Sequence, residues 1–147
     1  MNAIACDSIF YVESPEKIWP ALSRLAEDKI VAVDTETTGL DPWSDRLVSG
    51  QVAGGHGVVV MLWPVAGEPM NALRNFLESR DELVFHNAAF DLMFLKRPWH
   101  GFEVSRIFDS LLAQYVLRAG EEKGRLSLAV TAAEWLGEVV DKGTAAA

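Results

Sequence analysis

A short apolar, largely β-branched run that ends in two carboxylates is the feature that most constrains this chain. Ile30–Val33 predicts a buried strand, and Asp34 and Glu36 follow it two positions apart. Alternate residues of an extended strand point to the same face, so these carboxylates should project side by side. Like charges held this close are costly unless a cation or a shared proton offsets them, and a divalent cation is the natural partner. A polar strand end that enters a turn is the alternative interpretation.

A second strand end carries polar residues of the same kind. Leu83–Phe85 predicts a short strand, and His86 and Asn87 then lead into a helix over 88–96. Asp91 falls about one turn into that helix, where it can point back toward the end of the sheet. The alternative is that Asn87 caps the helix and Asp91 favours its positive end. If one rim of a sheet collects both segments, three carboxylates could bind two metal ions about 4 Å apart.

The order of the predicted elements indicates an α/β fold with a mixed sheet. Strands come first along the chain, and helices and strands then alternate. Gly54–Gly57 is expected to close a hairpin. We expect strands over 9–12, 30–33, 47–52, 58–62, 83–85 and 107–108, and helices over 15–27, 68–77, 88–96, 109–117 and 127–136. A ribonuclease H-like (RNase H-like) sheet has this order, as do other mixed α/β folds.

Length and composition narrow the class of protein. The 147 residues fit one domain, which we expect to span residues 1–142 with a tail over 143–147. Half of the residues are apolar, which is enough to form a core. We expect no membrane-spanning helix, because no apolar run reaches about 18 residues. We expect no secretory signal, because the N-terminus lacks a basic stretch followed by a long apolar one. Cys6 is the single cysteine, which excludes an internal disulfide and a thiolate zinc site and favours the cytoplasm.

The acidic charge balance restricts how the chain can meet a nucleic acid. Its formal net charge of −8 argues against broad electrostatic binding, which needs clustered Lys and Arg. An enzyme that meets phosphates through metal ions is still compatible with that charge, because its carboxylates hold the cations that face the substrate.

Taken together, the motifs resemble those of the DEDD (DnaQ-like) 3′-5′ exonuclease superfamily, and most closely the proofreading exonuclease domain of family A (Pol I-like) DNA polymerases. The resemblance covers about residues 8–142 and keeps motif order and spacing. Asp-Thr-Glu-Thr-Thr-Gly-Leu at 34–40 matches the first motif and His-Asn-Ala-Ala-Phe-Asp at 86–91 the second. Ile-Phe-Asp-Ser at 107–110 resembles the Asp-Thr/Ser helix start, and 125–128 with 135–137 resemble the Leu-Ser-Leu…Leu-Gly stretch.

The resemblance implies a fold, a cofactor and a set of site residues. The fold would be an RNase H-like mixed sheet with flanking helices, and the cofactor Mg²⁺ or Mn²⁺, with two ions in the complete family site. The implied catalytic metal ligands are Asp34, Glu36 and Asp91, and the implied nucleic-acid contacts are Thr37, Leu40, His86, Asn87 and Phe90. Packing on a helix face is the alternative for Phe90.

The same resemblance implies a reaction and its partners. The chain would hydrolyse phosphodiester bonds at the 3′ end of single-stranded or frayed DNA, with RNA as the alternative substrate. A DNA polymerase domain or subunit is an implied partner, and no membrane is involved.

One departure from the family concerns the fourth acid. The family's third motif is Tyr-x-x-x-Asp or His-x-x-x-x-Asp. Tyr115 is followed four positions on by Ala119, and His100 is followed by Val104 and Ser105 at the fourth and fifth positions. Neither pattern supplies an acid. Because the fourth acid completes a metal site and its partner orients the attacking water, the chain would be weakly active or inactive without it.

Three explanations for the missing acid are open. The chain can be a piece of a longer exonuclease or polymerase, or a natural short form that recruits the acid from a partner, from Asp141 or from Glu134. It can also be a catalytically incomplete domain that binds a nucleic-acid end or a polymerase partner. A fold that is incomplete at its C-terminal side should leave part of the sheet uncovered, which predicts marginal stability or self-association through an apolar patch.

Overall fold

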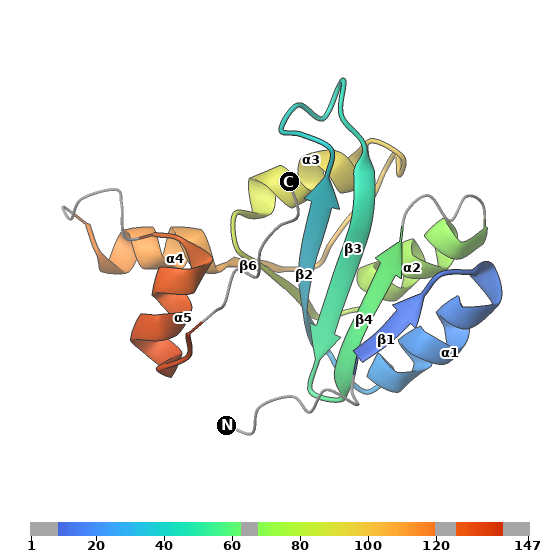
Figure 1. The fold of residues 1–147 in the computed structure, drawn as a ribbon, viewed down its shortest axis with the longest axis horizontal. Coiled ribbons are helices and arrows are strands. Elements are labelled where there is room, and N and C mark those ends of the chain that lie inside the picture. Colours follow the sequence, from blue (N-terminus) through green and yellow to red (C-terminus); the bar gives the residue numbers. More distant parts are fainter. Residues whose placement is uncertain (1–8, 63–67, 120–125, 140–147) are drawn as a thin grey trace.

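A mixed sheet organises the part of the chain that the computed structural model describes, residues 9–62, 68–119 and 126–139. Its six strands there are β1 (Ile9–Val12), β2 (Ile30–Thr37), β3 (Leu47–Gly54), β4 (Gly57–Leu62), β5 (Glu82–Phe85) and β6 (Ile107–Asp109). They lie in the order β1-β4-β3-β2-β5-β6 (Figure 1). β2, β3 and β4 are antiparallel, whereas β1, β5 and β6 are added in parallel. The predicted α/β class, with its hairpin and parallel additions, is confirmed.

The helices largely follow the expected ranges. They are α1 (Ile18–Leu22), α2 (Glu68–Glu78), α3 (Ala88–Lys96), α4 (Ser110–Leu117) and α5 (Leu128–Leu136). Asp109 and Ser127 cap α4 and α5 through their side chains, as their positions predict. The hairpin also forms, with Gly54 opposite Gly57 at its end.

The single helix predicted over 15–27 is wrong. The segment forms 3₁₀ turns at Pro15–Lys17 and Ser23–Leu25 on either side of the short α1. Pro20 lies inside α1, where it lacks the N–H that a longer α-helix would need. The Ser14 hydroxyl does not cap the helix, because it donates to Glu16 Oε1 at 2.6 Å.

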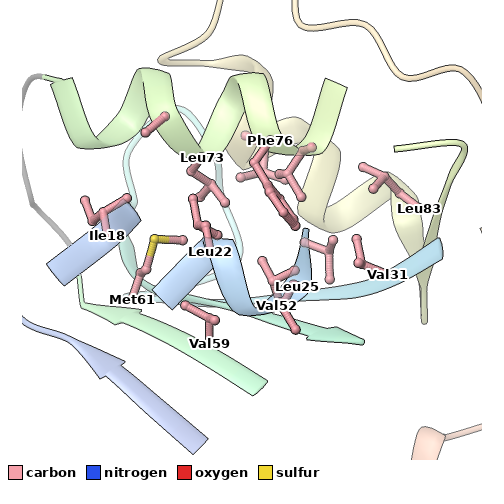
Figure 2. Packing of buried hydrophobic residues seen from close by; sticks show 14 of the residues in the cluster. Ile18, Leu22, Leu25, Val31, Val52, Val59, Met61, Leu73, Phe76 and Leu83 are labelled. Atoms are coloured by element: carbon pink, nitrogen blue, oxygen red, sulfur yellow. The ribbon is translucent and has the colours of Figure 1, made fainter. Parts of the chain in front are cut away.

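The hydrophobic core lies on one face of the sheet. Alternate residues of β2, among them Val31 and Val33, are buried there together with residues of β3, β4 and β5. Helices α1, α2 and α3 supply the other half of the core (Figure 2). The labelled residues of this cluster are Ile18, Leu22, Leu25, Val31, Val52, Val59, Met61, Leu73, Phe76 and Leu83. This packing fixes the register of β2 and so determines which of its side chains face away from the helices.

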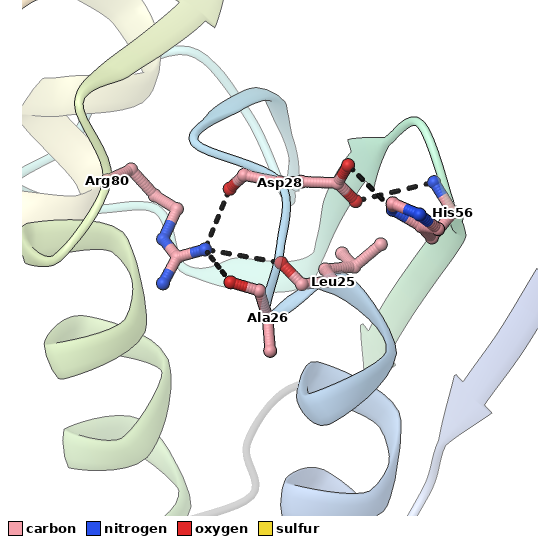
Figure 3. Close-up of polar contacts among 5 residues, drawn as sticks. All are labelled: Leu25, Ala26, Asp28, His56 and Arg80. Carbon is pink, nitrogen blue, oxygen red and sulfur yellow. Dashed lines mark hydrogen bonds and ion pairs between the residues drawn. The ribbon is translucent and has the colours of Figure 1, made fainter.

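A buried arginine ties α2 to the start of β2. Arg80 is only 8% exposed, and its Nη1 donates to the carbonyl oxygens of Leu25, Ala26 and Asp28 at 3.2, 3.1 and 2.7 Å (Figure 3). The Asp28 carboxylate in turn pairs with His56 Nδ1 at 2.9 Å, at the tip of the β3–β4 hairpin. The segment that leads into β2 is therefore held both by Arg80 and by His56.

The opposite face of the sheet, called the open face below, exposes several apolar side chains. Tyr11, Ile30 and Phe108 are 60%, 53% and 47% exposed, and register places all three on the side of Asp34. Helices α4 and α5 lie beside β6, at that edge of the sheet (Figure 1). The expectation of a partly uncovered sheet agrees with these exposures. None of the described helices is long and apolar enough to cross a membrane.

Candidate active site

Two of the predicted carboxylates stand on one face of β2. The strand runs to Thr37, further than predicted, so Asp34 and Glu36 lie within it and not beyond it. Burial alternates along β2, and both acids face the open side while Val33 and Thr35 face the helices. A register shift between Glu36 and Thr37 ends the regular pairing with β3 directly after the second acid. The side-by-side arrangement predicted from the i, i+2 spacing is therefore present.

The third predicted carboxylate reaches the same strand from the helical side. Asp91 lies in the first turn of α3 and is 3% exposed. Its Oδ1 accepts a hydrogen bond of 2.7 Å from the Thr35 hydroxyl, which points away from the open face between the two acids of β2. Thr35 was not among the predicted site residues. Its signal was present in the sequence, since the residue between two outward-facing acids must face the layer that carries Asp91.

The pKa values show that the carboxylates interact. Burial raises the pKa of Asp91 to about 6, the Thr35 hydrogen bond opposes that rise, and the charge of Asp34 adds to it. Partial loss of hydration raises the pKa of Asp34 as well, and the neighbouring charge of Glu36 raises it further. Asp34 thus couples to an acid on its own strand and to an acid on α3.

These carboxylates suit a hard cation. Within the described ranges none of the three pairs with a lysine or an arginine, although acids with restricted hydration are usually paired. Carboxylate oxygens are the donors that Mg²⁺ and Mn²⁺ prefer. The donor set, with the raised pKa values of Asp34 and Asp91, therefore fits a divalent ion. No group of three acidic, histidine or cysteine side chains in the described chain is close enough to hold one ion by itself.

The loop before α3 is fixed by a carboxylate from the next strand. Asp109 accepts hydrogen bonds from the N–H groups of Asn87 and Ala88 at 3.0 and 2.9 Å, and from those of Leu111 and Leu112 at the start of α4. Burial acts to raise the pKa of Asp109, but these donors outweigh it and lower the pKa. The Asp109 side chain thus fixes the starts of both α3 and α4, whereas the sequence indicated a role only at the start of α4.

Asn87 and His86 differ from the simplest expectations. Asn87 precedes α3 with φ 80°, in the left-handed region, and its side chain makes no capping hydrogen bond. The Asn87 side chain is exposed. The His86 ring is held at both nitrogens, with Ser110 Oγ at 3.0 Å from Nδ1 and the Leu126 carbonyl at 3.0 Å from Nε2. Because a carbonyl only accepts, Nε2 carries a proton.

The remaining predicted contacts divide into exposed and packed residues. Leu40 is 82% exposed just beyond β2, and Thr37 Oγ1 donates to the Gly39 carbonyl at 2.6 Å. Phe90 is partly buried and stacks at 51° on Phe94, with ring centroids 5.1 Å apart, which is the helix-packing alternative weighed for it. Exposure therefore favours Leu40 over Phe90 as a direct contact.

Of the two candidates for a fourth acid, the one within the described residues does not join this group. The side chain of Glu134, on α5, accepts a hydrogen bond from Gln114 and pairs with Arg118, so it links α5 to α4. Tyr115 lies exposed on α4. Asp141 lies outside the described residues.

An apolar-walled pocket adjoins Asp34 on the open face. It has a volume of about 230 Å³, and its lining includes Asp34, Gln51, His86 and Ser110, with Leu128 from α5. The His86 ring also lowers the pKa of Asp34 slightly, against the larger effect of burial. Asp34 therefore borders a hollow of limited size.

Comparisons with known proteins agree with this geometry. The sequence model of the 3′-5′ exonuclease family matches residues 9–147. DNA polymerase I of Aquifex aeolicus (strain VF5) is 32% identical over 133 residues, which are 90% of this chain and 21% of the polymerase. The chain therefore spans about a fifth of that relative.

Solved structures share the fold. The Aedes aegypti Nibbler EXO domain superposes with a TM-score of 0.76 at 21% identity, over 97% of this chain and 74% of that one. Brucella melitensis NrnC with bound Mg²⁺ superposes with a TM-score of 0.72 at 24% identity, over 91% of this chain and 62% of that one. The expected RNase H-like sheet with flanking helices is confirmed.

Proposed function

This chain belongs to the 3′-5′ exonuclease family, and from that membership we propose that it removes nucleotides from the 3′ end of single-stranded or frayed DNA with divalent cations. The observation that carries the proposal is the group of carboxylates around β2. Asp34 couples to Glu36 and to Asp91, and none of the three has a basic ion-pair partner in the described ranges. Such a group is expected to bind cations.

We propose Asp34, Glu36 and Asp91 as the ligands of Mg²⁺ or Mn²⁺. The Mg²⁺ bound in Brucella NrnC supports this choice of ion. A bound divalent ion would act as a Lewis acid on the scissile phosphate and lower the pKa of water. Thr35 would keep one Asp91 oxygen oriented, and its hydrogen bond would favour the ionised carboxylate.

Other residues of the two motifs are proposed to handle the nucleotide. Thr37, Leu40 and Asn87 lie next to the acids and keep solvent access, which supports their role as contacts to the 3′-terminal nucleotide. His86 and Phe90 are held by hydrogen bonds and by ring packing, and so are assigned to shaping the site.

The relationship to a DNA polymerase favours DNA over RNA as the substrate. Since the chain spans about a fifth of the Aquifex polymerase, a polymerase domain or subunit is proposed as its partner. Residues 1–142 are proposed as the exonuclease unit and 143–147 as its tail.

A second candidate is a domain that binds nucleic-acid ends or a polymerase without cleaving. Two observations favour it. The described residues hold no three-ligand metal group, and Glu134 is engaged between α4 and α5.

Degradation of a 5′-labelled single strand distinguishes the two candidates. Labelled DNA and RNA strands of the same sequence are incubated with the chain in Mg²⁺ and then in Mn²⁺, beside Asp34→Ala. A ladder that shortens from the 3′ end and disappears in Asp34→Ala supports the nuclease, and the faster strand identifies the substrate. A ladder that persists in Asp34→Ala contradicts the site.

An uncleaved strand is interpreted through metal binding. If Mn²⁺ then raises the melting temperature of the unmutated chain but not of Asp34→Ala, the binding domain is favoured. If Mn²⁺ raises neither melting temperature, the proposed metal site is wrong.

A further inference from the structure

The loop that follows the two acids of β2 holds two large apolar side chains in solvent. Leu40 and Trp43 are 82% and 84% exposed, among the highest values for apolar residues in the described chain. Leu40 belongs to the first sequence motif, whereas Trp43 belongs to none. An exposed tryptophan beside a candidate site is unusual for a surface that meets only water.

Hydrogen bonds fix the shape of this loop. The Asp41 carboxylate accepts from the Trp43 N–H at 2.9 Å and from the Ser44 hydroxyl at 3.0 Å. The Asp45 carboxylate accepts from the Asp41 N–H at 2.9 Å and from the Thr38 hydroxyl at 3.2 Å. The exposed side chain of Trp43 thus projects from an ordered backbone. A rigid platform of this kind loses little entropy when it binds a flat ligand.

Arginines accompany the tryptophan. Arg97, just past α3, donates to the carbonyls of Pro42 and Asp45 at 2.6 and 2.9 Å, so it anchors the loop to the helix that carries Asp91. Arg46 and Arg97 line a hollow of about 490 Å³, and neither forms an ion pair with a carboxylate in the described ranges. Asp45 lines the same hollow and the charge of Arg97 lowers the pKa of Asp41, so the two arginines offset two carboxylates here. In a chain of net charge −8, such a surface repels an anionic ligand less than the chain as a whole does.

The position of this loop relates it to the carboxylates. Trp43 lies in the loop between β2 and β3, six residues past the end of the strand that carries Asp34 and Glu36. Arg97 comes six residues after Asp91, which corresponds to roughly 9 Å along a helix axis. A single strand whose 3′ end reached the acids could therefore pass over this surface.

We propose that Trp43 is a stacking platform for an unpaired base upstream of the 3′-terminal nucleotide, with Arg46 and Arg97 facing the connecting phosphates. The proposal rests on the proposed function and adds a second point of contact to it. Stacking on an aromatic ring tolerates any base, so the platform would favour longer strands without sequence preference. Stacking on Trp43 would also contribute affinity for a nucleic-acid strand, which the net negative charge of the chain does not provide.

Binding of short oligothymidylates tests the platform. Fluorescence anisotropy gives Kd for labelled strands of two and eight nucleotides in EDTA, which withholds the metal and prevents cleavage. Trp43→Ala should weaken binding of the eight-nucleotide strand about 5- to 100-fold and leave the dinucleotide unchanged. Trp43→Phe should restore most of the loss. Trp19→Ala is the matched control, because Trp19 is 63% exposed on α1.

The salt dependence adds a second readout. Arg46→Gln should reduce the slope of log Kd against log salt concentration by about 0.7 for the longer strand. An unchanged Kd in Trp43→Ala overturns the platform, as does an eight-nucleotide strand that the unmutated chain does not bind. Either result leaves the proposed function to be judged separately, by whether Asp34→Ala abolishes cleavage.

Discussion

The Thr35 hydroxyl donates a hydrogen bond of 2.7 Å to Asp91 Oδ1, and this contact joins β2 to the first turn of α3 across 56 positions of sequence. It connects the two segments of the candidate site through the interior of the fold, while Asp34 and Glu36 project on the open face. Thr35, which lies between Asp34 and Glu36 in the sequence, thus positions the third carboxylate, that of Asp91.

Thr35→Val tests the electrostatic role of this contact. Valine keeps the shape but removes a hydrogen bond that lowers the pKa of Asp91, so that pKa should rise above about 6. The rise in melting temperature caused by Mn²⁺ should then need a higher pH than in the unmutated chain. Thermal melts at several pH values give the comparison, with Thr131→Val on α5 as the control. An identical pH profile in Thr35→Val and in the unmutated chain would count against this role.

Asp91→Asn should stabilise the metal-free chain at alkaline pH. The folded-state pKa of Asp91 is raised from 3.8 to about 6, so the native chain loses stability as the pH rises from about 4 to 6 and keeps that loss above 6. Removal of the charge should therefore add on the order of 2–3 kcal/mol at pH 8 and little at pH 4. Urea unfolding at both pH values measures the difference. A variant that is less stable than the parent at pH 8 contradicts the expectation.

Asp109→Ala should loosen the loop before α3 as well as the start of α4. Four N–H groups lose their acceptor, and we expect a cost of about 2–4 kcal/mol. Ser127→Ala is the matched control, because Ser127 caps α5 through one hydrogen bond and should cost about 1 kcal/mol. Hydrogen exchange should accelerate at the Asn87 and Ala88 amides in Asp109→Ala only. Unchanged exchange at these amides would restrict Asp109 to capping α4.

Arg80→Met should destabilise the chain strongly. The buried guanidinium donates to three carbonyl groups before β2, and its loss leaves them without that donor, at a cost of about 3 kcal/mol or more. Arg106→Met provides the contrast, because the side chain of Arg106 is 69% exposed in its pair with Glu82 and should contribute less than about 1 kcal/mol. Equal unfolding midpoints in urea for the two variants would refute the anchoring role of Arg80.

The sequence predicted those features that depend on neighbours along the chain. The alternation that places Asp34 and Glu36 on one face, the Gly54–Gly57 hairpin and the bounds of α3 all follow from local rules. The break of the first helix also has a local cause, because Pro20 interrupts a segment whose apolar spacing by itself predicts one longer helix.

Other features depend on contacts that no local pattern reveals. The partner of Thr35 lies on another element, and Asp109 holds Asn87 only because β6 lies beside β5. The ring of His86 is fixed by Ser110 and by Leu126, so its role could not be judged from its place in a motif. No sequence motif contains Trp43, so no pattern indicated a role for it.

The parallel pairing of β2 with β5 has a consequence for the timing of activity. β2, β3 and β4 are consecutive and can associate by local turns, whereas β5 must cross over from a distant part of the chain before Asp91 reaches Thr35. The carboxylates on β2 and α3 therefore come together only once this late, long-range step is complete. A nascent or partly degraded chain would lack the assembled group of carboxylates, so the proposed hydrolysis would be confined to molecules that have finished folding.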